Sequence, residues 1–154
     1  MKMNPRMEYR KANPQAFQAM LQMEKHVRSS GLDHSLLELV KIRASQINGC
    51  AYCLDMHTQE ARQKGESEQR LYLLNAWREA AVYTEAERAA LTLTEAVTLI
   101  SKEGVPENVF QNVQKHFSDA EIVSLLMAIN TINSWNRLAI ATGMSAPAEL
   151  PPAL

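Results

Sequence analysis

The sequence has little of what β-strands, membrane spans or repeated modules require. It contains 5 glycines among 154 residues, and no segment shows the alternation of β-branched residues that is typical of strands. The longest apolar run, residues 122–129, is interrupted by Ser124 and is far too short to cross a membrane. There is no internal repeat and no low-complexity segment. These absences favour an all-α globular protein.

Neither positive nor negative charge is in excess. The chain has 16 lysines and arginines against 17 aspartates and glutamates, a net charge of -1, which favours neither nucleic acid nor an anionic membrane as partner. Residues 1–17 contain charges and proline but no apolar stretch, unlike a secretory signal. We therefore expect a cytoplasmic protein, in which the only 2 cysteines are reduced at rest.

The composition is that of one ordinary domain. Apolar residues make up 46% of the chain and charged residues 21%, so 154 residues can enclose a sizeable core. We expect a single domain over residues 1–154, with a core at about 14–143 and a proline-broken tail at 144–154.

Start and stop signals divide this core into helices. "TEAE" at 84–87 and "SDAE" at 118–121 are capping-box patterns, Pro14 and Pro106 can open helices, Asp33 can cap one, and Gly49 can end one. The predicted helices span about 14–28, 34–48, 50–64, 68–75, 85–100, 106–117 and 119–142.

The last predicted helix is apolar on more than one side. Ile122, Leu125 and Ile129 lie on one side, while Val123 and Met127 lie on another. A helix with this pattern is buried all round. In so small a chain, that predicts packing between subunits as well as a core within each subunit.

The residues that carry chemistry lie in "NGCAYCLDMH" at 48–57. At about 100° per residue, Cys50, Cys53 and His57 fall on one face of a helix. Free N–H groups and the dipole at the helix N-terminus favour a thiolate, which is the reactive form. A second thiol one turn away can trap a sulfenic acid as a disulfide. The segment therefore predicts a dithiol redox site with its own base.

Two other interpretations remain open for these residues. The cysteines can be small buried apolar residues. Alternatively, Cys50, Cys53 and His57 can bind zinc with a fourth ligand from elsewhere, although structural zinc sites usually draw ligands from two segments and the chain has no second Cys/His pair.

The spacing of Glu38, Cys50, Cys53 and His57 resembles that of the AhpD-like alkylhydroperoxidases in the carboxymuconolactone decarboxylase superfamily. Eleven residues separate Glu38 from Cys50, two separate the cysteines, and three separate Cys53 from His57. "LLELVKIRASQINGCAYCLDMHT" resembles the core of that family, and "INSWNRLAIATG" resembles its last helix. The resemblance implies an all-α fold, assembly into trimers or hexamers, and no cofactor or metal.

The resemblance also implies a role for each residue. Cys53 matches the cysteine that attacks the peroxide, and Cys50 matches the partner that protonates the leaving group and closes the disulfide. His57 and Glu38 match a proton relay. Taken by itself, the helix dipole favours Cys50 as the thiolate, and the position of Glu38 on its helix, beside Ile42, is typical of a surface charge.

The resemblance implies a thiol-dependent peroxidase acting on hydrogen peroxide or organic hydroperoxides, with an external dithiol or protein reductant as partner. A redox sensor or disulfide relay, and a lactone decarboxylase of the same superfamily, are alternatives.

Tyr52 stands where the mycobacterial type carries a histidine and is expected to be a packing residue or pocket wall. For Asn133, Asn136 and Arg137, we weigh a structural network against a place in the thiol pocket.

Overall fold

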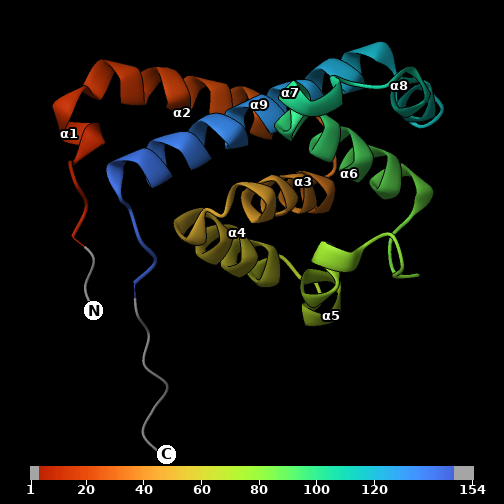
Figure 1. Cartoon of the computed structure of the whole chain (residues 1–154), viewed down its shortest axis with the longest axis horizontal. Helices are drawn as coiled ribbons and strands as arrows, with labels where there is room; N and C mark the ends of the chain where they lie inside the picture. The colour runs from red at the N-terminus through yellow and green to blue at the C-terminus, as the bar shows by residue number, and fades with distance from the viewer. Residues whose placement is uncertain (1–3, 148–154) are drawn as a thin grey trace, which may run out of the picture.

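The computed structural model describes residues 4–147, and every regular element in that range is a helix, which confirms the all-α prediction (Figure 1). Part of the predicted tail, residues 148–154, lies outside the described residues. The elements are α1 (Tyr9–Ala12), α2 (Pro14–Arg28), α3 (His34–Asn48), α4 (Ala51–Gln63), α5 (Glu68–Tyr72), η1 (Leu74–Ala76), α6 (Glu85–Thr98), α7 (Ile100–Glu103), α8 (Glu107–Gln114) and α9 (Asp119–Thr142).

Helix α3 is the centre of the fold. It packs against α4, α6 and α9, while α2 lies along α9 on the far side (Figure 1). Two apolar clusters flank α3: one includes Val40 and Leu125 and joins α2, α3, α6, α8 and α9, and the other includes Leu39 and Leu74 and joins α3, α4, α5, η1 and α6. Because both clusters bury side chains of the same helix, α3 is enclosed on nearly all sides.

Most predicted boundaries agree with the structure to within a few residues. Both capping boxes are present, at Thr84–Glu87 and at Ser118–Glu121. Asp33 occupies the N-cap position of α3, but its side chain makes no capping hydrogen bond. The predicted helix over 68–75 is divided into α5 and η1, and α8 ends at Gln114 rather than near Phe117. The four-residue helices α1 and α7 are too short to show a periodic pattern.

Helix α9 is covered only in part by the rest of its own chain. Ile122, Leu125 and Ile129 are buried against the rest of the chain, but Val123 is 58% exposed and Ile140 is 46% exposed. A single subunit therefore leaves apolar side chains of α9 on the outside, and packing between subunits stays a prediction. Among residues 4–147, no helix combines the length and apolar character needed to cross a membrane.

The turn between α3 and α4 depends on glycine. Gly49 has φ of 70° and ψ of 36°, and nothing lies within 4 Å of the position a Cβ would take. We expect Gly49→Ala to lower the free energy of unfolding by about 1–2 kcal/mol, because an L side chain is strained in this left-handed conformation. Gly49→Asn should cost less, since asparagine tolerates that conformation. Urea unfolding measures both; equal losses would mean that the backbone conformation is not the cause.

Candidate functional site

The dithiol lies at the junction of α3 and α4. Cys50 is the N-cap residue of α4 rather than a member of its first turn, and its backbone N–H donates to the Ser45 carbonyl at 3.0 Å. The Cys53 N–H donates to the Cys50 sulfur at 3.3 Å. The chain reverses at Gly49, so the end of one buried helix determines where the next helix begins.

Cys50 and Cys53 form a disulfide, with their Cα atoms 5.3 Å apart. The structure is therefore that of the oxidised protein. Both residues are buried, and they pack with Ala139 of α9, next to Tyr52 and Met144.

Cys53 lines a cavity beside His57. Cys53 and His57 line a pocket of about 300 Å³ between α1, α2, α4 and α9, whereas Cys50 is not among its lining residues. The walls are mostly apolar and aromatic, and they are formed by Tyr9, Phe17, Leu21, Tyr52, Met56, Trp135 and Ala139. A reactant entering this pocket would therefore meet Cys53. Tyr52 is part of the pocket wall, as expected from the sequence.

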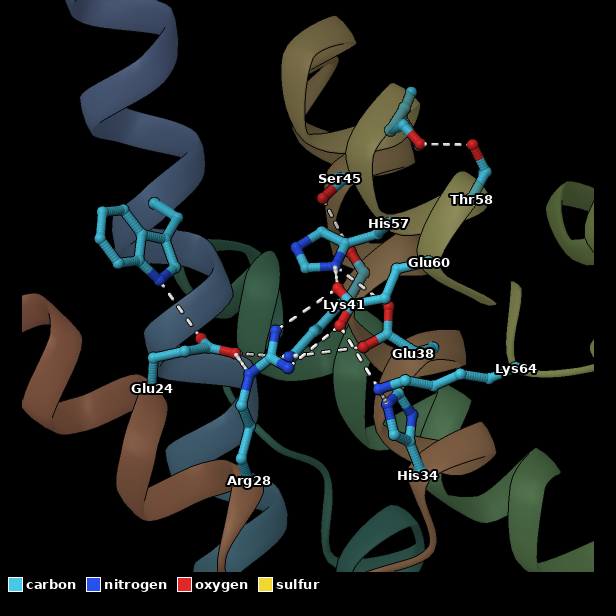
Figure 2. Close-up of polar contacts among 12 residues, drawn as sticks. Glu24, Arg28, His34, Glu38, Lys41, Ser45, His57, Thr58, Glu60 and Lys64 are labelled. Carbon is cyan, nitrogen blue, oxygen red and sulfur yellow. Dashed lines mark hydrogen bonds and ion pairs between the residues drawn. The ribbon is translucent and has the colours of Figure 1, made fainter. Parts of the chain in front are cut away.

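His57 is bonded to a carboxylate from the central helix. Its Nδ1 lies 3.0 Å from Glu38 Oε2, and the two residues are 3% and 2% exposed (Figure 2). A carboxylate at Nδ1 favours the tautomer with its proton on that nitrogen, which leaves Nε2 as the proton acceptor. Its helical position alone favoured a surface charge for Glu38, whereas the resemblance implied a place beside His57; the side chain is buried there because α4 covers that side of α3.

A buried lysine provides the charge opposite Glu38. The Lys41 side chain is 1% exposed, and its Nζ lies 3.6 Å from Glu38 Oε1 and 2.6 Å from Glu24 Oε1. Figure 2 shows the carboxylates of Glu24 and Glu38 approaching Lys41 from opposite sides. Removing one partner of a buried ion pair costs about 3–5 kcal/mol, because the other charge is left buried without a counter-charge. Loss of any one of these three side chains should therefore destabilise the junction of α2 and α3.

Arg28 extends the charged cluster towards α4. It pairs with Glu24 at 3.1 Å and with Glu60 at 3.0 Å. Burial raises the pKa of Glu24, but Lys41 and Arg28 outweigh this effect and leave the pKa below its ordinary value. Burial likewise raises the pKa of Glu60, while its hydrogen bond to Arg28 and the nearby positive charges lower it to about 2. Both carboxylates are therefore ionised at neutral pH.

The polar residues of α9 form a separate network. Asn48 donates to the side-chain oxygens of Asn133 and Asn136, both at 2.9 Å, and Asn136 donates to Ser45 at 3.0 Å. Arg137 donates to Asn133 at 2.8 Å. None of these residues lines the pocket with Cys53. They tie the end of α3 to α9, which supports the structural interpretation of these residues.

Within residues 4–147, one group of possible metal ligands includes Glu38 itself. Ligand atoms of His34, Glu38 and Glu60 lie within 4.8 Å of one another. Lys64 Nζ already contacts both His34 and Glu60, and Figure 2 shows it between them. A metal ion there would have to displace an ammonium group. In the oxidised form the two sulfurs are bonded to each other and do not offer thiolates to zinc.

Sequence reasoning did not identify Glu24, Arg28, Lys41 or Glu60. Glu24 and Arg28 come from α2, far from the cysteines in the sequence, and no local pattern connects them to the site. Lys41 did carry a signal, because it stands in "LELVKI", where a charge interrupts a nearly continuous apolar run. A lysine in such a run is buried only when a carboxylate pairs with it.

A helical fold with a CxxC pair at a helix N-terminus, backed by a His–Glu pair, defines the class of AhpD-like proteins. The chain belongs to the carboxymuconolactone decarboxylase family, whose model matches residues 14–96 and so includes Glu38, Cys50, Cys53 and His57.

Relatives of this chain are similar over almost its whole length. The uncharacterized protein YdfG of Bacillus subtilis (strain 168) is 44% identical over 147 residues, which are 96% of this chain and 100% of that protein. The solved structure of ATU0492 from Agrobacterium tumefaciens, a protein of unknown function with a suggested role as the antioxidant defence protein AhpD, is 49% identical, with a TM-score of 0.92 over 95% of this chain and 100% of that chain.

The fold alone is shared more widely. The debrominase Bmp8 has a TM-score of 0.78 at 20% identity, over 90% of this chain and 74% of that chain. Since a debrominase has the same helical arrangement, the reaction has to be argued from the side chains of the site and not from the fold.

The ion pairs of Glu60 predict how stability depends on pH. Because the pKa of Glu60 falls from 4.5 to about 2 in the folded protein, its stabilising effect is complete above about pH 4.5 and is lost as the pH falls towards 2. Glu60→Gln should therefore lose less stability than the wild type across that interval, as urea unfolding at several pH values would measure. The exposed Glu79→Gln variant is the control; a Glu60→Gln profile parallel to the wild type would contradict the assignment.

Proposed function

We propose that the protein is a thiol-dependent peroxidase that reduces hydrogen peroxide or organic hydroperoxides. The observation that carries the proposal is that Cys53 and His57 line one pocket while His57 is bonded to the buried Glu38. The pocket would hold the peroxide against the thiol, and the buried pair would handle the proton.

In the first step, the Cys53 thiolate attacks the distal oxygen of the hydroperoxide. An S–O bond forms, the O–O bond breaks, and the alkoxide or hydroxide leaves as the alcohol or water after taking a proton. Cys53 becomes a sulfenic acid, so the sulfur is oxidised by two electrons and the peroxide is reduced by two. Cys50 is close enough to act as the proton donor, since the two cysteines are bonded to each other in the oxidised state.

His57 and Glu38 serve as the proton relay in this scheme. With Nδ1 held by Glu38, the free Nε2 of His57 can accept the Cys53 proton one helical turn away. The imidazolium that forms would face two carboxylates, Glu38 at 3.0 Å and Glu60 at 3.8 Å. These negative charges stabilise the proton on the ring, which is what a base beside a thiol requires.

Access, rather than the helix dipole, favours Cys53 as the attacking residue. The dipole and the Cys53 N–H both favour negative charge on Cys50. Both cysteines are buried, however, and Cys53 lines the pocket beside the base, whereas Cys50 is not among the residues that line it. A thiolate that a peroxide cannot reach does not react, so we assign the attack to Cys53 and the closing of the disulfide to Cys50.

In the second step, the Cys50 sulfur attacks the Cys53 sulfenic acid, and water leaves as the disulfide forms. An external dithiol or a protein reductant then supplies two electrons and two protons to restore both thiols. We also infer that the protein acts in the cytoplasm as a homo-oligomer, a trimer or a hexamer. The exposed Val123 and Ile140 of α9 support association, because it would remove apolar surface from water.

The alternative functions require fewer of the residues and features found at the site. Lactone decarboxylation has no role for a dithiol, although the family is named for that reaction. A redox sensor or disulfide relay needs the cysteines but not a pocket that ends at one of them. Turnover separates these possibilities, because a sensor is oxidised once and recycles poorly even when excess dithiol is present.

The test compares hydroperoxide consumption by the wild type and the two Cys→Ser variants, with dithiothreitol as reductant. We expect Cys53→Ser to be inactive, because the attacking sulfur is gone. Cys50→Ser should form a sulfenic acid at Cys53 that a dimedone probe labels, because nothing closes the disulfide. Mass spectrometry of the labelled peptide identifies the residue. Labelling of Cys50 in the Cys53→Ser variant instead would reverse the two roles.

A second test concerns the relay. We expect His57→Ala and Glu38→Gln each to lower the rate about a hundredfold to ten-thousandfold, the usual effect of losing a general base. The double variant should be little slower than the slower single variant, because members of one relay act as a unit. Stopped-flow oxidation of the reduced protein measures the rates, and circular dichroism confirms folding.

The pH dependence supplies a control for the relay. In His57→Ala, part of the rate should return at high pH, where the thiol ionises without help. A Glu38→Gln rate equal to that of the wild type would remove Glu38 from the relay and leave it a structural partner of Lys41.

A further inference from the structure

The charges that line the Cys53 pocket do not all cancel. Besides His57, its charged lining residues are Arg10, Glu24 and Arg28. Glu24 and Arg28 pair with each other at 3.1 Å, and each has a further partner, Lys41 for Glu24 and Glu60 for Arg28. Arg10 is therefore left as the positive charge of the pocket.

Arg10 is fixed in place without a carboxylate partner. Its guanidinium donates to the Tyr52 hydroxyl at 3.2 Å, and it lies 5.2 Å from the centre of the Phe17 ring and 5.8 Å from that of Tyr9. Among residues 4–147 it forms no ion pair, unlike Arg28, Arg43, Arg70 and Arg78. Contacts with two rings and hydrogen bonds to the Tyr9 and Tyr52 side chains hold the guanidinium in position, while its other N–H donors remain available.

Arg10 lies at the rim of the pocket. It also lines a neighbouring surface pocket formed by the N-terminal segment and Met144, so it stands on the rim between the two. Tyr52, which it contacts, is the residue directly before Cys53. Because Arg10 and Cys53 line the same pocket, a ligand that fills it would contact the guanidinium with one group and Cys53 with another.

The chemistry of the two ends defines the ligand. A guanidinium with free donors binds a carboxylate through two parallel hydrogen bonds. One unbalanced positive charge matches a monoanion, and the apolar walls between Arg10 and Cys53 match a hydrocarbon chain or ring. We propose that the pocket binds organic hydroperoxides that carry a carboxylate at the end remote from the O–O bond, and that Arg10 determines this specificity. The hydroperoxide half of this assignment rests on the proposed function; the carboxylate half does not.

A binding experiment tests the carboxylate half without any turnover. Calorimetry on the oxidised wild type would compare ω-hydroxyoctanoic acid, which has the form of a reduced product, with its methyl ester. We expect the acid to bind at least about tenfold more tightly, the effect of a hydrogen-bonded charge pair near the surface. Arg10→Met should lose this preference. Lys11→Met, which removes an exposed charge from the same short helix, should keep it.

Equal binding of acid and ester by the wild type, no binding of either, or a preference that survives in Arg10→Met would each overturn the assignment. The matching kinetic experiment compares kcat/KM for the ω-hydroperoxide of octanoic acid and for its methyl ester. The ratio of acid to ester should fall about tenfold in Arg10→Met and stay unchanged in Lys11→Met.

The two experiments separate the two possible failures. If acid binding depends on Arg10 but no hydroperoxide is consumed, the peroxidase proposal fails and the carboxylate site stands. If both hydroperoxides are consumed with equal efficiency by the wild type, the peroxidase proposal stands and the role of Arg10 is wrong. If both substrates slow equally in Arg10→Met, Arg10 supports the pocket wall and does not select the substrate.

Discussion

The hydrogen bond between Glu38 and His57 is the interaction on which the arrangement of the site depends. It joins α3 to α4 out of contact with water, and it leaves Nε2 of His57 as the acceptor nitrogen. A buried carboxylate is costly unless a positive charge faces it, and Lys41 provides that charge. Lys41 in turn requires Glu24 of α2. The chemistry proposed for one helical turn therefore depends on three helices.

His57 lies where a mostly apolar pocket meets a cluster of paired charges. Glu24 and Arg28 belong to both, since they line the pocket with Cys53 and pair with Lys41 and Glu60. The charges lower the pKa values of Glu24 and Glu60, so these carboxylates remain ionised during a reaction at neutral pH. Nδ1 of His57 faces two of the carboxylates of this site, Glu38 and Glu60, so a proton on the ring would lie beside negative charge.

The relatives place these features in context. The family model spans α2 to α6, which contribute every member of the charged cluster and the dithiol. Arg10 and Trp135 lie outside the matched range, on α1 and α9, and they form the outer part of the pocket.

The sequence by itself determined the helices and the dithiol. Capping boxes, glycine stops and the CxxCxxxH spacing act over a few residues, so Thr84, Ser118, Gly49, Cys50 and Cys53 were predictable from local rules. The tertiary structure decided that Glu38 is buried under α4, where its helical position alone favoured the surface and only the spacing resemblance implied a place beside His57. It also decided which apolar side chains of α9, such as Val123 and Ile140, stay exposed in one chain. It also decided which cysteine lines the pocket, and it brought Arg10, Glu24 and Lys41 to the site. Burial and ion pairing join residues that are distant in sequence, and no local pattern records which helix will pack over which.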